Sequence, residues 1–438
     1  MSESVEKTTI RKLYLRLLPF SFVLYFICYL DRINVGFAAL TMNKDLNFSA
    51  SIFALGASAF FWGYCLFEIP SNIVLERVGA RLWIARIMIT WGLLSAGTAF
   101  VTGATGFTVV RALLGIAEAG FFPGMILYFT YWFPGRYRGR VVAWFMTALP
   151  ISIALGSPIS TALLELDGVF GLTGWRWVFV GEGIPSVLLG IAVLFYLTDR
   201  PTEARWLTPA ERDWLVAELR AERHAVDSVR VFTILQSLTN LRVLALSVIY
   251  LGIATAALGL VIFLPQIIKQ LGISNMMTGW VTAIPYVVGA IGMVVWGHVS
   301  DRMKERRWNL FASCLLASVG LIAAGLLNGS YWALAGLSAA TIGFYGMKAP
   351  FWPLPSTFLS GTAAAAAIAA INSLGNLGGI IGPNAVGWIK DATGSFEAGL
   401  YVLAAFALLS AVVTLISVRD PSREEAPRGL GLPAALED

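Results

Sequence analysis

Residues 17–40 read LLPFSFVLYFICYLDRINVGFAAL, an apolar run that contains one acid and one base, Asp31 and Arg32. A helix needs roughly 20 predominantly apolar residues to cross the hydrocarbon core of a bilayer. This run therefore predicts a membrane-spanning helix. It is too long for the apolar region of a signal peptide and lacks a small-residue cleavage site, so we expect it to stay in the mature protein.

Comparable runs recur along the chain as six spans, a polar gap and six more spans. The predicted spans are 17–40, 50–75, 82–101, 107–132, 141–164, 177–198, 242–268, 278–299, 309–327, 331–359, 364–389 and 397–418. The runs are continuous and long, whereas strands of a membrane barrel alternate over about ten residues. The sequence therefore predicts an all-α integral membrane protein with 12 transmembrane helices in two pseudo-symmetric six-helix bundles.

The composition supports a membrane protein and excludes a water-soluble globule. Hydrophobic residues make up 57% of the chain, charged residues only 13%, and the mean hydropathy is +0.74, against roughly 25% charged residues in soluble domains. The net charge of +5 follows the predicted loops and forms no continuous basic patch, so we expect no binding of nucleic acid. The three cysteines have no metal-ligand spacing, and we expect no metal and no cofactor.

Lysine and arginine define the orientation of the spans. With both termini in the cytoplasm, 24 of the 31 basic residues lie on the cytoplasmic side, four lie on the opposite side, and three lie inside spans. Cytoplasmic loops carry the excess of basic residues in membrane proteins. We therefore predict a multi-pass protein of the cell inner (plasma) membrane with both termini in the cytoplasm.

The same pattern predicts four regions. We expect an N-terminal bundle at 1–198, a cytoplasmic linker at 199–241, a C-terminal bundle at 242–418 and a disordered cytoplasmic tail at 419–438. Within the linker, Thr208-Pro-Ala-Glu211 has the form of a capping box. We expect a short surface helix from there to about Arg223.

Two predicted cytoplasmic turns have similar sequences, each with an acidic residue beside an arginine. Residues 75–81 read LERVGAR after the second span, and residues 297–307 read GHVSDRMKERR after the eighth. Together with the 6+6 spans, they resemble the loop signature of the major facilitator superfamily, which is kept here as Gly297, Asp301, Arg302 and Arg306. The resemblance implies two bundles that rock about a central site, with these four residues in a gating or loop role. The alternative is that Asp301 and Arg302 only set the topology.

Five charged residues lie deep inside predicted spans: Asp31, Arg32, Arg111, Glu118 and Lys348. Each costs about 2.5 to 3.5 kcal/mol at the centre of a span on insertion scales, so they are expected to pair or to line water. Arg111 and Glu118 are seven residues apart and share a helix face. From the depths of the spans we predict the pairs Asp31–Arg111 and Arg32–Glu118. The alternative is a neutral network that only locks two helices together.

Three further polar residues receive more ordinary interpretations. Glu68 and Glu182 are expected at span ends, as helix-end or gating groups. Asn376 is expected to bond between helices.

Several motifs then resemble one branch of the superfamily. Residues 29–34 (YLDRIN), 68–72 (EIPSN) and 111–120 (RALLGIAEAG) resemble the anion:cation symporter family. Residues 350–355 (PFWPLP) and 371–383 (INSLGNLGGIIGP) are similar to its tartrate and phthalate permease branch. The resemblance covers essentially the whole chain.

This resemblance implies roles for individual residues. It implies proton coupling by Asp31 and Glu118, substrate-carboxylate binding by Arg32, and a partner role for Arg111. It also implies substrate contacts of the kind that sugar-acid members make, at Tyr64, Trp352 and Asn372. Leu149 stands where those members have a glutamine, which argues against a polyhydroxylated sugar acid.

The residues themselves support a coupling mechanism. A substrate carboxylate that binds the shared arginine leaves Glu118 desolvated beside a new negative charge, so a proton taken from outside neutralises it. Lys348 adds a cation in the second half, which suits a molecule with an acid group at each end. Its alternative is a lysine that snorkels to one membrane face.

We therefore expect a proton-coupled symporter that imports a small organic anion, a tartrate-like dicarboxylate or a phthalate-like aromatic acid, by alternating access. The expected partners are this anion, protons and the lipid bilayer, and the expected functional unit is a monomer. An obligate anion exchanger of the same fold and a sugar-acid symporter are the alternatives. The sequence has no phosphate-binding loop and no nucleophile elbow, and we expect no enzyme.

Overall fold

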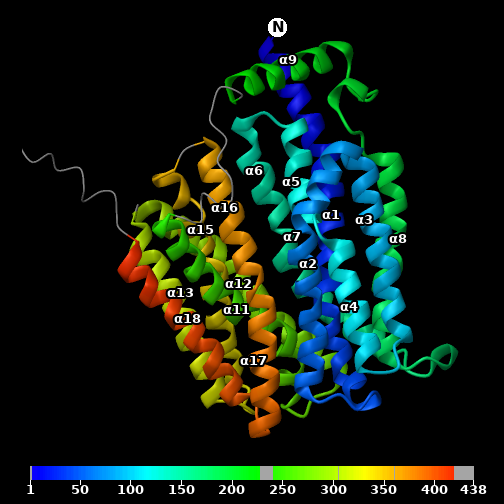
Figure 1. The fold of residues 1–438 in the computed structure, drawn as a ribbon, viewed down its shortest axis with the longest axis vertical. Coiled ribbons are helices and arrows are strands. Elements are labelled where there is room, and N and C mark those ends of the chain that lie inside the picture. The colour runs from blue at the N-terminus through cyan, green and yellow to red at the C-terminus, as the bar shows by residue number, and fades with distance from the viewer. Residues whose placement is uncertain (1, 227–239, 304, 360, 419–438) are drawn as a thin grey trace, which may run out of the picture.

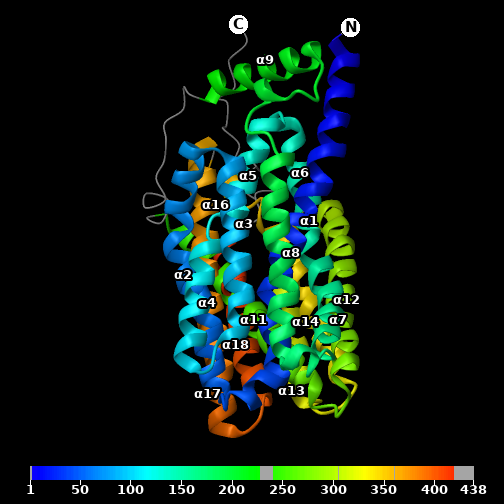
Figure 2. The ribbon, with the colours of Figure 1, turned by 90° about the vertical axis from the view of Figure 1, so that its right-hand side faces the viewer.

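The computed structural model describes residues 2–226, 240–303, 305–359 and 361–418, and the elements in these ranges are helices (Figures 1 and 2). The first half contains α1 Ser2–Asp45, α2 Ala50–Val78, α3 Ala80–Gly97, η1 Thr98–Phe100, α4 Ala104–Glu118, α5 Phe121–Trp132, α6 Gly135–Met146, α7 Ala148–Leu164, η2 Val169–Gly171 and α8 Gly174–Tyr196. The connection contains η3 Pro201–Glu203 and α9 Pro209–Val226. The second half contains α11 Leu241–Lys269, α12 Asn275–Met303, α13 Arg306–Leu326, α14 Ala333–Gly346, α15 Lys348–Phe351, η4 Pro355–Thr357, α16 Gly361–Asn376, α17 Gly378–Thr393 and α18 Glu397–Ser417.

The helical segments confirm the predicted all-α membrane architecture. Within the described ranges, 11 segments are long and apolar enough to cross a membrane. The predicted tenth span, 331–359, is not among them, although its first part forms the helix α14. This region continues as α15 and η4, so it still accounts for the twelfth span of the fold.

Four predicted spans are interrupted inside the membrane region. The backbone leaves helical dihedral angles at 119–120, between α4 and α5. The interruptions at 147 between α6 and α7, at 347 between α14 and α15, and at 377 between α16 and α17 are single residues that keep right-handed helical φ/ψ. At the first break Gly120 has φ +88°, a left-handed conformation that favours glycine because it has no Cβ. Interrupted helices in carriers commonly border the binding site. The hydropathy pattern predicted continuous helices here, because apolarity does not report backbone breaks.

Among the described helices, the main contacts between the two halves are those of α1 with α11, α2 with α17, and α7 with α12. Several hydrogen bonds between α2 and α17 join the halves. Asn384 donates to Ser58 (2.8 Å), and Asp391 accepts from the backbone N–H groups of Ala50 (2.9 Å) and Ser51 (2.8 Å). The bonds from Ala50 and Ser51 lie at the end of the molecule opposite α9 (Figure 1).

The linker contains the predicted surface helix. The Thr208 backbone N–H donates to Glu211 (2.9 Å) and the Glu211 N–H donates to the Thr208 hydroxyl (3.4 Å), which confirms the capping box. Ion pairs attach α9 to the first half, from Lys12 to Glu211 (2.8 Å) and from Arg136 to Glu218 (2.6 Å). The helix therefore belongs structurally to the first half. Residues 227–239 of the linker and the predicted disordered tail, 419–438, lie outside the described residues.

Candidate functional site

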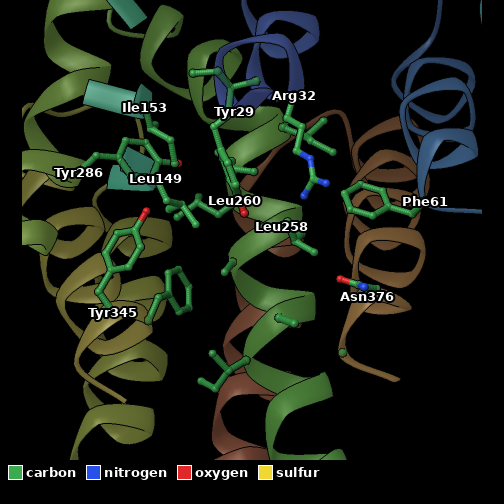
Figure 3. Close-up of a pocket in the computed structure, with 18 of the residues that line it drawn as sticks. Tyr29, Arg32, Phe61, Leu149, Ile153, Leu258, Leu260, Tyr286, Tyr345 and Asn376 are labelled. Carbon is green, nitrogen blue, oxygen red and sulfur yellow. The ribbon is translucent and has the colours of Figure 1, made fainter. Parts of the chain in front are cut away.

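A cavity of about 160 Å³ lies between the two halves, and side chains from both halves line it (Figure 3). The first half contributes Arg32, Phe60, Arg111 and Leu149, and the second half contributes Tyr250, Tyr286, Tyr345, Lys348 and Asn376, among others. Figure 3 shows Arg32 and Asn376 on one side of the space and Tyr286 and Tyr345 on the other. The cavity is small and mostly apolar and aromatic, as is usual for small-molecule sites.

The charged side chains of the wall are all basic. Arg32 and Arg111 come from the first half and Lys348 from the second, and no described residue that lines the cavity is acidic. Lys348 has no acidic partner in the described part of the chain, and its ammonium lies 5.0 Å from the centroid of the Tyr345 ring. The cavity wall therefore favours an anion.

Arg32 makes the contact that the sequence predicted with Glu118. Its Nε lies 2.5 Å from Glu118 Oε1, and Cys28 also lies within hydrogen-bonding distance of this oxygen (3.3 Å). The guanidinium of Arg32 stands over the ring of Tyr64 at 4.8 Å, which adds a cation–π attraction. The side chain of Arg32 is 19% exposed and that of Glu118 only 1%, so the arginine reaches the cavity while its partner stays behind it.

The predicted pair between Asp31 and Arg111 is wrong. Asp31 instead accepts hydrogen bonds from Trp91 (2.6 Å), Ser95 (2.7 Å), Ser186 (2.6 Å) and Asn34 (3.3 Å). These donors come from α3, α8 and α1. Asp31 and Arg32 are neighbours on one helix, so their side chains point in different directions and Asp31 has partners other than those of Arg32. Asp31 therefore sits in a neutral hydrogen-bond network.

Arg111 keeps its place near the centre without the predicted partner. Its side chain lines the cavity, and its guanidinium lies 5.3 Å from the Phe60 centroid. Within the described residues, its Nε and Nη1 have no hydrogen-bond acceptor. A cationic side chain that lines a cavity and has buried donors without an acceptor is suited to an anionic ligand.

The other predicted substrate residues lie outside the lining of the cavity. Tyr64 is buried beneath Arg32, and Trp352 packs edge-on against Tyr250 with ring centroids 5.0 Å apart. Asn372 is also absent from the lining, whereas Asn376, one turn further along α16, is part of it. The substrate roles of Tyr64, Trp352 and Asn372 stay predictions. Asn376 forms a hydrogen bond with Glu68 on α2, as its interpretation as an interhelical group predicted, and it also lines the cavity.

The two remaining acids were also misplaced. Glu68 and Glu182 are 8% and 1% exposed, so neither is a helix-end group in contact with water. The sequence contains one signal for the surroundings of Glu182. Glu182 and Ser186 on α8, like Trp91 and Ser95 on α3, are polar groups four residues apart inside apolar runs, and this spacing places each pair on one helix face.

The loop-motif residues lie where α12 ends and α13 begins. Gly297 and Arg302 belong to α12, and Arg306 is the first residue of α13. Arg302 is exposed. Asp301 belongs to α12 as well, but its side chain lies outside what the structure describes. The gating role of these four residues stays a prediction.

Comparisons with known proteins agree with this architecture. The family model described as Major Facilitator Superfamily matches residues 21–383. A protein of Agrobacterium vitis named "Putative tartrate transporter" is 51% identical over 419 residues, which cover 96% of this chain and 96% of that protein. A protein of Acinetobacter baumannii named "Quinolone resistance transporter" is 40% identical over 412 residues and covers 94% of this chain and 95% of its own length.

A solved structure shares the fold at low sequence identity. The bacterial homologue of the human lysosomal transporter Spinster, in an inward-facing and occupied conformation, superimposes with a TM-score of 0.76 at 17% identity. The match covers 93% of this chain and 97% of that one. The family model, the relatives and the twelve-span helical architecture together show that this chain is a multi-span membrane protein that belongs to the Major Facilitator Superfamily.

Proposed function

We propose that this protein is a proton-coupled symporter that imports a small organic anion with two carboxylates by alternating access. The observation that carries this proposal is the cavity wall, which has three basic side chains, no acid among its described residues, and basic groups from both halves. A cation in each half can hold one acid group each. The tartrate name of the Agrobacterium vitis relatives supports the same class of substrate.

The Arg32–Glu118 pair supports coupling to protons. In the empty site, Arg32 stabilises the ionised form of Glu118 at 2.5 Å. A substrate carboxylate that binds Arg32 weakens this interaction and leaves a buried carboxylate without its cation, which is costly in a medium of low dielectric. Protonation of Glu118 removes this cost, so anion and proton bind cooperatively.

The two halves and the orientation complete the proposal. Residues 1–198 and 242–418 act as the two rocking bundles, and both termini face the cytoplasm of a cell whose inner membrane carries the proton gradient. Movement of one net positive charge across 100 mV supplies about 2.3 kcal/mol. The apolar side chains Leu149 and Ile153 on the wall favour an apolar or aromatic frame between the acid groups over a polyhydroxylated one.

Transport in proteoliposomes tests the proposal. Labelled tartrate and phthalate serve as separate probes, with an inward proton gradient and with or without unlabelled anion inside. We expect the gradient to drive accumulation of one of them in the wild type, and Glu118→Gln to retain counterflow but to lose accumulation. Exchange that requires internal anion and ignores the gradient would instead identify an obligate exchanger, and accumulation by Glu118→Gln equal to that of the wild type would remove the role of Glu118.

A further inference from the structure

Glu182 is a buried carboxyl group that the proposed coupling mechanism does not use. It lies on α8 and is 1% exposed. Its Oε1 accepts a hydrogen bond from Ser160 on α7 (2.6 Å), whereas its Oε2 has no hydrogen-bond partner among the described residues. An ionised carboxylate in such a place is costly unless donors or a cation surround it.

The surroundings of Glu182 contrast with those of Asp31. Asp31 accepts four hydrogen bonds at 2.6 to 3.3 Å, which suits a charged carboxylate. The polar neighbours of Glu182 are Ser160, Asn34 and the carboxylate of Asp31, and no basic residue in the described part of α1, α3 or α7 compensates it. Pairs of carboxyl groups in such different environments take different protonation states.

The number of buried charges also favours the protonated form of Glu182. Of the acids buried in the described spans, Asp31, Glu68 and Glu118 match the three basic groups Arg32, Arg111 and Lys348 in number. An ionised Glu182 would add a fourth negative charge without a counterpart. The protonated form needs none, and its O–H can donate to a neighbouring acceptor such as the Asn34 amide oxygen, which lacks a donor in the described structure.

The donor to Glu182 lies on a helix that contacts the other half. Ser160 on α7 is flanked in sequence by Thr161, and α7 packs on α12. A Cβ on Gly279 of α12 would lie 2.7 Å from the Ser157 carbonyl oxygen, so the two backbones are closely packed there. Movement of the halves against each other therefore acts directly on the helix that carries Ser160, a hydrogen-bond donor to Glu182.

We propose that Glu182 is a proton-binding site of the transport cycle, separate from the Arg32–Glu118 pair, and that it is protonated in the conformation seen here. A proton from water forms an O–H bond on the free carboxylate oxygen, and the same bond breaks when the proton returns to water on the other side. This inference rests on the proposed function, since a proton that is carried through the cycle requires coupled transport. Glu182 then raises the number of protons moved with each anion by one.

Proton and anion fluxes in proteoliposomes test this role. The anion that the wild type accumulates is the probe, and a pH-sensitive dye reports the protons. We expect Glu182→Gln, which resembles the protonated side chain in shape, to keep counterflow and to move one proton fewer per anion. The matched control is Glu165→Gln, the same change at an exposed position of the same region, for which the ratio stays that of the wild type.

The outcomes separate the two proposals. A wild type that moves no proton with its anion refutes the proposed function, whereas a coupled wild type and an equally coupled Glu182→Gln variant refute only the role of Glu182. Infrared spectroscopy of the purified protein adds a test that needs no transport. At neutral pH, Glu182→Gln is expected to remove one protonated-carboxyl band, and an unchanged spectrum overturns the proposal.

A second variant covers the case in which Glu182→Gln does not fold. Ser160→Ala removes the hydrogen bond that supports the ionised form, so loss of the protonated-carboxyl band is expected at higher pH than in the wild type. A titration that coincides with that of the wild type would mean that Glu182 is not the group observed.

Discussion

The unpaired lysine of the cavity permits a quantitative test of the substrate class. Lys348 lines the cavity, has no acidic partner among the described residues, and belongs to the second half, whereas the arginines of the wall belong to the first. If it binds the second carboxylate of the substrate, Lys348→Ala removes one hydrogen bond to a charged group, worth about 1.5 to 3 kcal/mol. Since about 1.4 kcal/mol corresponds to a factor of ten, binding should weaken roughly 10- to 150-fold.

The test compares two ligands that differ by one acid group. Isothermal titration calorimetry with phthalate and with benzoate gives the affinity of the wild type and of Lys348→Ala for each. We expect the large loss only for phthalate, because the single carboxylate of benzoate binds Arg32. If the two-acid substrate has a tartrate frame instead, tartrate and glycerate form the corresponding pair.

Controls separate loss of charge from loss of structure. Lys348→Met keeps most of the side-chain volume and should reproduce the loss. Lys269→Ala removes a lysine at the end of α11 that bonds the Ile273 carbonyl oxygen and does not line the cavity, and it should bind like the wild type. Equal losses for the one-acid and two-acid ligands would refute the assignment of Lys348 to a second carboxylate and with it the preference for dicarboxylates.

Three further predictions concern the rest of the molecule. Arg32→Lys should weaken anion binding at least tenfold in the same calorimetric assay, because a lysine cannot bond Glu118 and a carboxylate through one planar group; wild-type affinity would contradict the site. Asp391→Ala removes a carboxylate that accepts two backbone N–H groups at the start of α2, a capping contribution of about 1 kcal/mol. Spin-label distances across the end opposite α9 should then show that the ratio of open to closed molecules rises about fivefold. An unchanged distance distribution would contradict this. Burial raises the pKa of Glu211, but hydrogen bonds from Lys12 and Thr208 outweigh it and hold the pKa below its ordinary value of 4.5. The contact thus stabilises α9 above that pH and is lost as the pH falls through the lowered value. Proteolysis of α9 should therefore rise in acid, and less so in Lys12→Ala, which already lacks the contact.

Much of the fold follows from local composition along the chain. An apolar run of sufficient length has one favourable outcome in lipid, a helix that satisfies its own backbone, so the spans and the surface helix at Thr208 were predictable. The Arg32–Glu118 pair was also predictable, because few partners exist for a charge at that depth. The hydropathy pattern could not reveal the interruptions at 119–120, 147, 347 and 377, since each lies inside a predominantly apolar run.

The partners of the other polar groups depended on how the helices rotate and approach. At the contact between α3 and α8, a Cβ on Gly92 would lie 2.7 Å from the Gly183 carbonyl oxygen. This close approach brings Ser95 and Ser186 to Asp31, which is why Asp31 does not pair with Arg111. The sequence by itself therefore determined which residues enter the membrane and which charges need a partner. Only the tertiary structure decided which partner each one has, because a side-chain contact depends on the rotation and spacing of helices from distant parts of the chain, whereas hydropathy depends on neighbouring residues alone.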